Sequence, residues 1–267
     1  MLDALRETDV QTHHVGRERP ERRRVGRLPG ETALFLSETA HDLNVGAHFL
    51  DQLTDGERKL VATRGRSYGV GAGEAVFTQG ERHGGIFIIE QGRVRVFYTA
   101  PSGREITLAY WTPGHFIGGP EIAGGGVHVW SGEAVEDCRI LRLDSAALRD
   151  LVATVPNFAL ALIQGLASKG RCYSSMAQML GTRSVIERLA QFILNLGDLY
   201  GETDGNAVNI RRRITHDQIA AMVGSTRQWV TMMLKRFQRE GLVTVDAQGI
   251  RIVQMERLQD MASGDTG

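Results

Sequence analysis

The sequence has 267 residues, of which 42% are hydrophobic and 23% are charged, and its formal net charge is zero. This is the composition of an ordinary globular protein, and the length suits one large domain or two modest ones. No run approaches the roughly 18 apolar residues of a transmembrane helix, so we expect no membrane partner. The two cysteines, Cys138 and Cys172, are too few for a disulfide framework or a cysteine metal site, and we expect a reducing, cytoplasmic location.

The N-terminal stretch, residues 1–30, is polar and rich in arginine, glutamate and histidine, without an apolar period. We expect it to be a disordered tail. Residues 31–64 carry leucines at helical spacing, which predicts short helices that lead into the next domain.

Residues 65–143 have the pattern of short strands. Runs of β-branched and aromatic residues lie between turn glycines and cover 86–89, 94–98, 106–111 and 139–143. In one of them, Val94, Val96 and Tyr98 alternate with Arg95 and Phe97, the period of a half-buried strand. Asp144 can then cap a short helix. The pattern predicts a jelly roll, which we place with its flanking helices at residues 31–155.

A long helix is expected at residues 156–182, beginning at Pro156. Six positions of this helix follow a 4-3-4-3-4 spacing: Leu162, Leu166, Lys169, Tyr173, Met176 and Leu180. All of them are apolar or aromatic except Lys169. Such a seam fits a parallel helix pair across a twofold axis, so we expect a homodimer. The alternative is a helix that packs on the core of its own domain.

A second amphipathic helix is expected at 184–200, and the break at 181–183 predicts a hinge. Thr215 and Gln218 then match a capping box, and the helix that they begin is expected to end at Gly224. A small Ala220 at the helix crossing and an apolar Val230 in the next helix complete the spacing of a helix-turn-helix.

A hairpin is expected next, with strands at 242–245 and 250–253. Residues 183–260 therefore read as a winged helix-turn-helix. Between 209 and 241 there are seven Lys or Arg residues against two acidic ones, which indicates a polyanionic partner for this segment.

The start of the second helix of this motif meets base edges in the major groove of DNA. We expect Arg227, Gln228 and Trp229 to read bases there, because arginine pairs with guanine and glutamine with adenine. Arginines before the motif and hydroxyls at the helix starts suit phosphate; these are Arg211, Arg213, Thr215, Ser225, Thr226 and Thr231.

These features resemble the cyclic-AMP receptor protein and Fnr (Crp-Fnr) family of transcription regulators over residues 45–255. The resemblance rests on Phe116-Ile117-Gly118 in the roll and on Ile214-Thr215 through Val223-Gly224-Ser225-Thr226-Arg227. It implies an α+β fold: a double-stranded β-helix (jelly roll) like that of cyclic-nucleotide-binding domains, a dimerisation helix, and a C-terminal winged helix-turn-helix. It also implies a homodimeric regulator, not an enzyme, that binds a palindromic operator, works with RNA polymerase and is controlled by a small effector.

The resemblance also shows departures from the family. Met232 stands where the family has a further base-reading arginine, so we expect a different operator. Gly119 replaces the glutamate that holds ribose, and His128-Val129 stand at the Arg-Ser positions that hold phosphate. Tyr173-Ser174 stand at the adenine-contacting Thr-Ser pair. No Lys or Arg lies between Arg104 and Arg139, so a buried phosphate would lack a cation, and we expect that cyclic AMP is not the effector.

The effector pocket is expected to be aromatic and poor in cations, lined by Tyr110, Gly118, Gly119, Glu121, His128, Val129, Trp130, Tyr173 and Ser174. A small neutral or aromatic effector fits such a pocket. Two alternatives are a haem held by His115, His128 or Cys138, and a constitutive regulator with a vestigial pocket. No cofactor is required and no metal site is predicted. A cupin-type enzyme would need clustered ligands, whereas His115, His128 and Glu121 are scattered.

Overall fold

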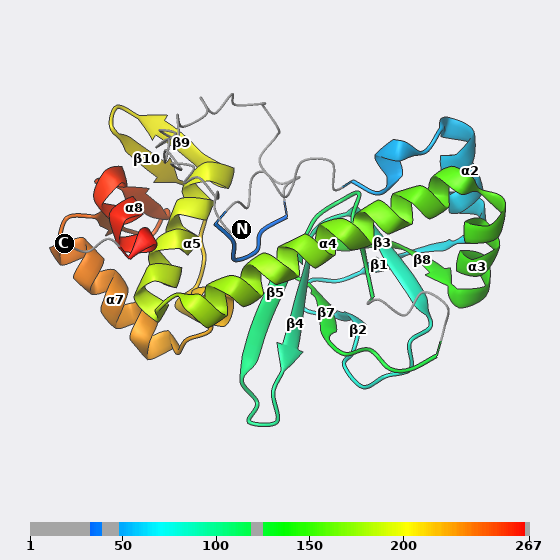
Figure 1. Ribbon diagram of the computed structural model, residues 1–267, viewed down its shortest axis with the longest axis horizontal. Coiled ribbons are helices and arrows are strands. Elements are labelled where there is room, and N and C mark those ends of the chain that lie inside the picture. Colours follow the sequence, from blue (N-terminus) through cyan, green and yellow to red (C-terminus); the bar gives the residue numbers. More distant parts are fainter. Residues whose placement is uncertain (1–32, 39–47, 119–124, 265–267) are drawn as a thin grey trace, which may run out of the picture.

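The computed structural model describes residues 33–38, 48–118 and 125–264 (Figure 1). A β-roll, built from strands between residues 66 and 144, and a C-terminal domain of residues 185–263, which we call the reader, are joined by α4 (Pro156–Thr182). Helix α4 runs across the molecule and covers the range predicted for the long helix. The predicted tail at 1–30 lies outside the described residues. Within the described ranges, no single helix has the length and hydropathy to cross a membrane, although α3 (Ser145–Thr154) and α4 together, a bent pair, reach the length and composition of a span.

Two antiparallel four-stranded sheets form the roll, in the orders β1-β8-β3-β6 and β2-β7-β4-β5. The strands are β1 (Arg66–Val70), β2 (Ala75–Phe77), β3 (Gly85–Gln91), β4 (Val94–Thr99), β5 (Glu105–Trp111), β6 (Phe116–Ile117), β7 (Ser131–Ala134) and β8 (Cys138–Asp144). The predicted jelly roll within an α+β fold is confirmed.

Strand β4 departs from simple alternation. The pairing of β4 with β5 shifts in register between Val96 and Phe97. Because a shift of one residue exchanges the two faces of a strand, Phe97 turns inward and Tyr98 turns outward, with exposed fractions of 7% and 38%. The expected alternation, which puts Val94, Val96 and Tyr98 on one face, is therefore broken at Tyr98.

Helices cover the ends and one side of the roll: η1 (Leu50–Gln52), α2 (Asp55–Arg64), α3 (Ser145–Thr154) and α4. Asp144 caps α3, since its side chain accepts hydrogen bonds from the N–H groups of Ala146 and Ala147. Gly165 lets α4 approach the roll closely, because a Cβ at this position would come within 2.5 Å of the Phe116 ring.

The reader contains α5 (Val185–Tyr200), β9 (Gly201–Asp204), β10 (Ala207–Ile210), α6 (His216–Val223), α7 (Arg227–Arg239), β11 (Val243–Val245), β12 (Ile250–Ile252) and α8 (Met255–Ser263). Its sheet has the order β11-β12-β10-β9. The winged helix-turn-helix is confirmed. Strands β9 and β10 were not predicted, because most of β9 is polar and exposed. Helix α8 carries the reader to Ser263, past the predicted limit of 260.

The apolar core of the reader continues into the roll. One buried cluster joins Leu34, Leu36 and Tyr110, the last of which is in β5, to the core of the helix-turn-helix. Phe192 and Ile193 of α5 belong to the same cluster. The roll and the reader therefore pack on each other, with residues 33–38, which we call the N-terminal strap, between them (Figure 1).

Candidate nucleic-acid interface and effector cavity

The turn between α6 and α7 is built as the sequence predicts. Thr215 Oγ1 accepts from the N–H of Gln218 at 3.2 Å, and Gln218 Oε1 accepts from the N–H of Thr215 at 2.9 Å. Gly224 ends α6 with φ of +65°, a left-handed conformation that penalises any residue with a side chain. Val230 is fully buried between the helices. These contacts fix the direction in which α7 leaves the turn.

The first turn of α7 presents polar side chains to solvent. Arg227 and Gln228 are both exposed. Arg227 Nη1 lies 3.7 Å from Asp217 Oδ2, but the side chains are 69% and 67% exposed, so this ion pair is weak and leaves the guanidinium able to turn. Trp229 is half-buried and packs on the reader core, which argues against its predicted base-reading role. Met232, 53% exposed, lies one helical turn beyond Gln228.

Several hydroxyls predicted to contact phosphate already have partners inside the reader. Thr226 Oγ1 accepts from the N–H of Trp229 at 3.3 Å and caps α7. Thr231 Oγ1 donates to the carbonyl of Arg227 at 2.9 Å and lies 2.7 Å from Nδ1 of His216. Thr215 belongs to the capping box described above, and Ser225 is half-buried in the turn. These groups position the two helices first of all.

Two predicted arginines lie between β10 and α6. Arg211 is 72% exposed and its Nε is 3.7 Å from Glu202 Oε2. Arg213 Nε donates to the carbonyl of Ala247 at 2.8 Å, in the turn between β11 and β12, the hairpin that forms the wing of the motif. This hydrogen bond connects the wing to the segment just before α6. Both are exposed residues on the side of the reader from which α6 begins.

A cavity of about 430 Å³ lies between the roll and α4. It is lined by Val96, Trp111, Phe116, Ile117, Gly118, Trp130, Leu166, Lys169, Gly170 and Tyr173. Tyr173 and Trp130 face each other, with ring centroids 5.8 Å apart. Burial raises the pKa of Tyr173 far above its ordinary value, so its hydroxyl stays protonated.

The predicted pocket residues divide into three groups. Gly118, Trp130 and Tyr173 line the cavity. Gly119 and Glu121 lie outside the described residues. The remaining four belong elsewhere and are corrected: Tyr110 lines a gap between roll and reader, Val129 and Ser174 are exposed, and His128 is buried inside the roll.

His128 has a structural role. Its Nδ1 donates to the carbonyl of Gly118 at 2.7 Å, and its ring lies 4.6 Å from those of Phe77 and His83. Burial lowers its pKa, so the ring is neutral near pH 7. The hydrogen bond holds the strand end that forms one wall of the cavity.

The residues predicted as haem ligands lie outside the lining of the cavity. His115 Nδ1 lies 3.0 Å from the carbonyl of Thr112, and Cys138 Sγ donates to the carbonyls of Arg93 and Glu136. Neither these two residues nor His128 lines the cavity. In the described part of the chain, no group of three or more His, Cys, Asp or Glu residues could hold a metal ion.

Lys169 is a functional candidate that the sequence analysis missed. Its nitrogen is buried and lies 3.4 Å from the centroid of the Trp111 ring. The cavity therefore contains a cation, contrary to the cation-poor pocket expected from the sequence. The sequence does contain an indication of this site, because burying a lysine in the middle of an apolar stripe costs free energy unless its ammonium group has a partner.

Comparison with known proteins places both halves of the chain. Residues 70–155 match the cyclic nucleotide-binding domain family, and residues 187–261 match the Crp-like helix-turn-helix domain family. The chain belongs to the Crp-Fnr family of transcription regulators. The resemblance stated from the sequence is confirmed, and the family is one of DNA-binding regulators.

Individual relatives support this placement. The CRP-like cAMP-activated global transcriptional regulator of Mycobacterium tuberculosis is 29% identical over 187 residues, which are 70% of this chain and 83% of the relative. The fumarate and nitrate reduction regulatory protein of Escherichia coli is 24% identical over 250 residues, covering 91% of this chain and 96% of the relative.

Solved structures of the Crp-Fnr family share the fold. The c-di-GMP responsive global regulator CLP of Xanthomonas campestris superimposes with a TM-score of 0.68 at 17% identity, over 74% of this chain and 99% of the other. A CooA mutant from Carboxydothermus hydrogenoformans gives 0.65 at 22% identity, over 76% of this chain and 89% of the other.

The dimerisation seam of this Crp-Fnr protein needs correction. Leu162 and Met176 are buried inside the chain, with 3% and 8% exposure, and Leu166, Tyr173 and Leu180 are half-buried. The predicted seam therefore faces the chain's own roll and reader. A second stripe with 3-4 spacing is exposed on an adjacent side of α4, about 100° round the helix from the seam: Leu160, Ile163, Ala167, Gly170, Ser174, Ala177 and Gly181. Leu160 and Ile163 are 56% and 60% exposed.

The N-terminal strap links the three parts of the molecule. Leu34 pairs with Tyr110 of β5 through two backbone hydrogen bonds of 3.0 and 2.8 Å. The carbonyl of Ser37 accepts from Asn195 Nδ2 on α5 at 2.7 Å, and its hydroxyl lies 2.7 Å from that of Ser175 on α4. The strap thus contacts the roll, the long helix and the reader.

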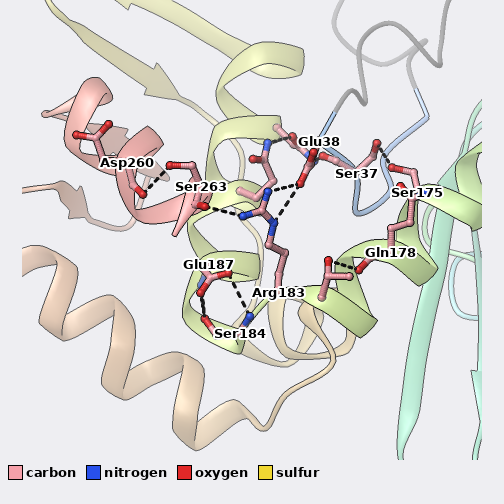
Figure 2. Close-up of polar contacts among 12 residues, drawn as sticks. Ser37, Glu38, Ser175, Gln178, Arg183, Ser184, Glu187, Asp260 and Ser263 are labelled. Carbon is pink, nitrogen blue, oxygen red and sulfur yellow. Dashed lines mark hydrogen bonds and ion pairs between the residues drawn. The ribbon is translucent and has the colours of Figure 1, made fainter. Parts of the chain in front are cut away.

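The junction of α4 and α5, predicted as a hinge, lies beside this strap (Figure 2). Arg183 is hydrogen-bonded to Glu38 of the strap and donates to the carbonyl of Ser263 at 2.6 Å. Arg188 donates to the carbonyl of Arg183 at 2.7 Å and to that of Val223 at 2.8 Å. A hydrogen-bonded path therefore runs from the strap through the junction to the helix-turn-helix.

Proposed function

We propose that the protein is a homodimeric, sequence-specific DNA-binding regulator in which α7 of each subunit enters a major groove. The supporting observation is the exposure of Arg227 and Gln228 on the first turn of the second helix of a complete helix-turn-helix. Arg227 would pair with guanine and Gln228 with adenine. Met232 cannot form such bonds, so the operator would differ from that of members with arginine there.

Contacts to phosphate would set the register on the duplex. Arg211 and Arg213 are exposed beside the wing, and Thr226 and Ser225 lie at the N-terminus of α7, where backbone N–H groups favour an anion. Thr215 and Thr231 would act mainly by holding α6 and α7 in place.

The dimer would form through the exposed stripe on α4. Apolar and small residues at heptad spacing allow two helices to pack in parallel across a twofold axis. Gly170 belongs both to the stripe and to the cavity lining, so the dimer face and the cavity share a wall. A twofold dimer requires a palindromic operator.

A small effector in the cavity would control the position of the readers. Tyr173 lines the cavity, and Ser175, two residues further along α4, contacts Ser37 of the strap. A movement of α4 would therefore displace the strap, and the strap would displace Asn195 and Arg183, to which it is hydrogen-bonded. Apart from Lys169 the walls are mostly apolar and offer few groups for the hydroxyls of a sugar, which argues against cyclic AMP. Family membership alone suggests RNA polymerase as a partner, and the protein would act by binding, not by catalysis.

Selection of DNA from a random pool by the purified full chain tests this function. We expect a palindrome whose half-sites are centred about 10–10.5 base pairs, or a multiple of that, apart. Lys59→Ala, at an exposed lysine on α2 outside the reader, should select the same motif. Failure to enrich any sequence, or enrichment of a motif without twofold symmetry, would contradict the proposal.

A further inference from the structure

Lys169 places its ammonium group in the cavity and away from water. Its nitrogen is buried and lies 3.4 Å from the centroid of Trp111 and 5.1 Å from that of Phe116. No described residue accepts a hydrogen bond from it. Burial lowers the pKa of Lys169 to about 7.

The ring contacts do not balance the burial of this charge. A cation over an aromatic face recovers only part of the free energy lost when an ammonium leaves water. A buried lysine with a structural role is normally paired with a carboxylate. The described residues that line the cavity include neither Asp nor Glu, so within them the charge lacks a counter-ion.

The other walls determine what kind of anion fits. They are apolar and largely aromatic, formed mainly by Val96, Trp111, Phe116, Ile117, Trp130, Leu166 and Tyr173. A flat apolar group can stack on these ring faces or meet their edges. The volume of about 430 Å³ is within the range of small-molecule sites, roughly 300–1,000 Å³.

The geometry points to an aryl carboxylate as the class of molecule held in this cavity, with its carboxylate paired to Lys169 and its ring packed against the apolar and aromatic walls of the cavity. This inference rests on the proposed function, because it names the effector class of the same site. The expectation of a neutral effector is corrected, because Lys169, the misfit in the predicted seam, lines the cavity.

Isothermal titration of the full chain with a matched pair of probes tests the assignment. The probes are 2-naphthoate and its neutral amide, 2-naphthamide, which differ in charge and hardly in shape. The wild type should bind the acid about tenfold or more tightly than the amide, as expected for a charge-assisted hydrogen bond in a site without water. Lys169→Met keeps an unbranched apolar side chain and removes the charge, so this preference should disappear while amide binding persists. Lys59→Met removes an exposed lysine of α2 and should keep the preference.

Three results would overturn the assignment: equal affinity of the wild type for acid and amide, an unchanged preference in Lys169→Met, or no binding of either probe. Binding to the selected DNA is measured on the same samples. If the chain binds DNA but shows no preference for 2-naphthoate, the proposed function stands and the assignment of an aryl carboxylate is wrong. If the chain binds 2-naphthoate through Lys169 but binds no DNA, the assignment of the ligand class stands and the proposed function is wrong.

Discussion

Glu38 and Arg183 are 145 residues apart in the sequence, and Glu38 Oε1 lies 2.7 Å from Arg183 Nη2 (Figure 2). The pair joins the N-terminal strap to the junction where the long helix ends and the reader begins. The position of the reader therefore depends on residues far upstream of the roll, and not on α4 alone.

The buried hydrogen bond of the strap should contribute more to stability than its ion pair. Asn195→Ala removes the donor to the carbonyl of Ser37, a residue that is fully buried. An unpaired buried carbonyl costs about 1–3 kcal/mol, and we expect this loss in the free energy of unfolding in urea. Glu38→Gln is the comparison: its carboxylate is 53% exposed, so the loss should stay below about 1 kcal/mol. A larger loss for Glu38→Gln than for Asn195→Ala would contradict this ranking.

Lys169 should make the stability of the protein depend on pH. Between its folded pKa of about 7 and its ordinary value of 10.5, the unfolded chain binds a proton that the folded chain does not. Stability therefore rises with pH in this window. Lys169→Met should be more stable than the wild type, and the difference should narrow by on the order of 2 kcal/mol between pH 7 and pH 9.

The neighbours of Lys169 should not obscure this effect. Burial raises the pKa of Cys172 to about 11 and raises that of Tyr173 as well, so both stay neutral in the folded protein in this window. Their ionisation in the unfolded chain is common to the wild type and Lys169→Met, and it cancels from the difference in stability between the two proteins. Lys59→Met, which removes an exposed lysine, should follow the wild type at each pH. A difference between Lys169→Met and the wild type that does not change with pH would show that the ammonium is hydrated in the folded state.

The sequence predicted the reader well because its signals are local. A capping box at Thr215 and Gln218, a left-handed glycine at 224 and the spacing to Val230 all act within one supersecondary unit. Strands β3, β4, β5 and β8 of the roll were predicted for the same reason, apart from the shifted register in β4, whereas β1, β2, β6 and β7 were not predicted.

The faces of α4 could not be assigned in this way. Two stripes of the helix have heptad spacing, and only packing against the roll decides which one is buried. The more apolar stripe, with Leu162 and Met176, packs inside the chain, and the stripe with Leu160 and Ile163 stays exposed. The contacts of the strap with Ser175 and Asn195 join residues more than 130 positions apart, so a pattern within one segment of the sequence cannot predict them.

The exposed stripe should control dimerisation. Ile163→Glu places a charge in the proposed helix pair, and in a twofold dimer it does so twice. We expect the dimer dissociation constant to rise about tenfold or more in sedimentation equilibrium, since each buried charge is costly. Val152→Glu adds the same charge at a 38% exposed residue of α3, off the stripe, and should leave the dimer intact. Equal effects of the two substitutions would place the dimer interface elsewhere.

The proposed function depends on the recognition of a base by Arg227, which a matrix of binding affinities can measure. The selected operator is changed at each base pair in turn, and the affinities of wild type, Arg227→Ala and Lys235→Ala are measured by fluorescence anisotropy. Arg227→Ala should lose about 1–3 kcal/mol of binding and should no longer distinguish bases at one pair per half-site. Lys235→Ala, at an exposed lysine on the same helix, should keep every base preference even if all its affinities fall together. An Arg227→Ala protein with the full base preferences of the wild type would show that Arg227 does not read a base.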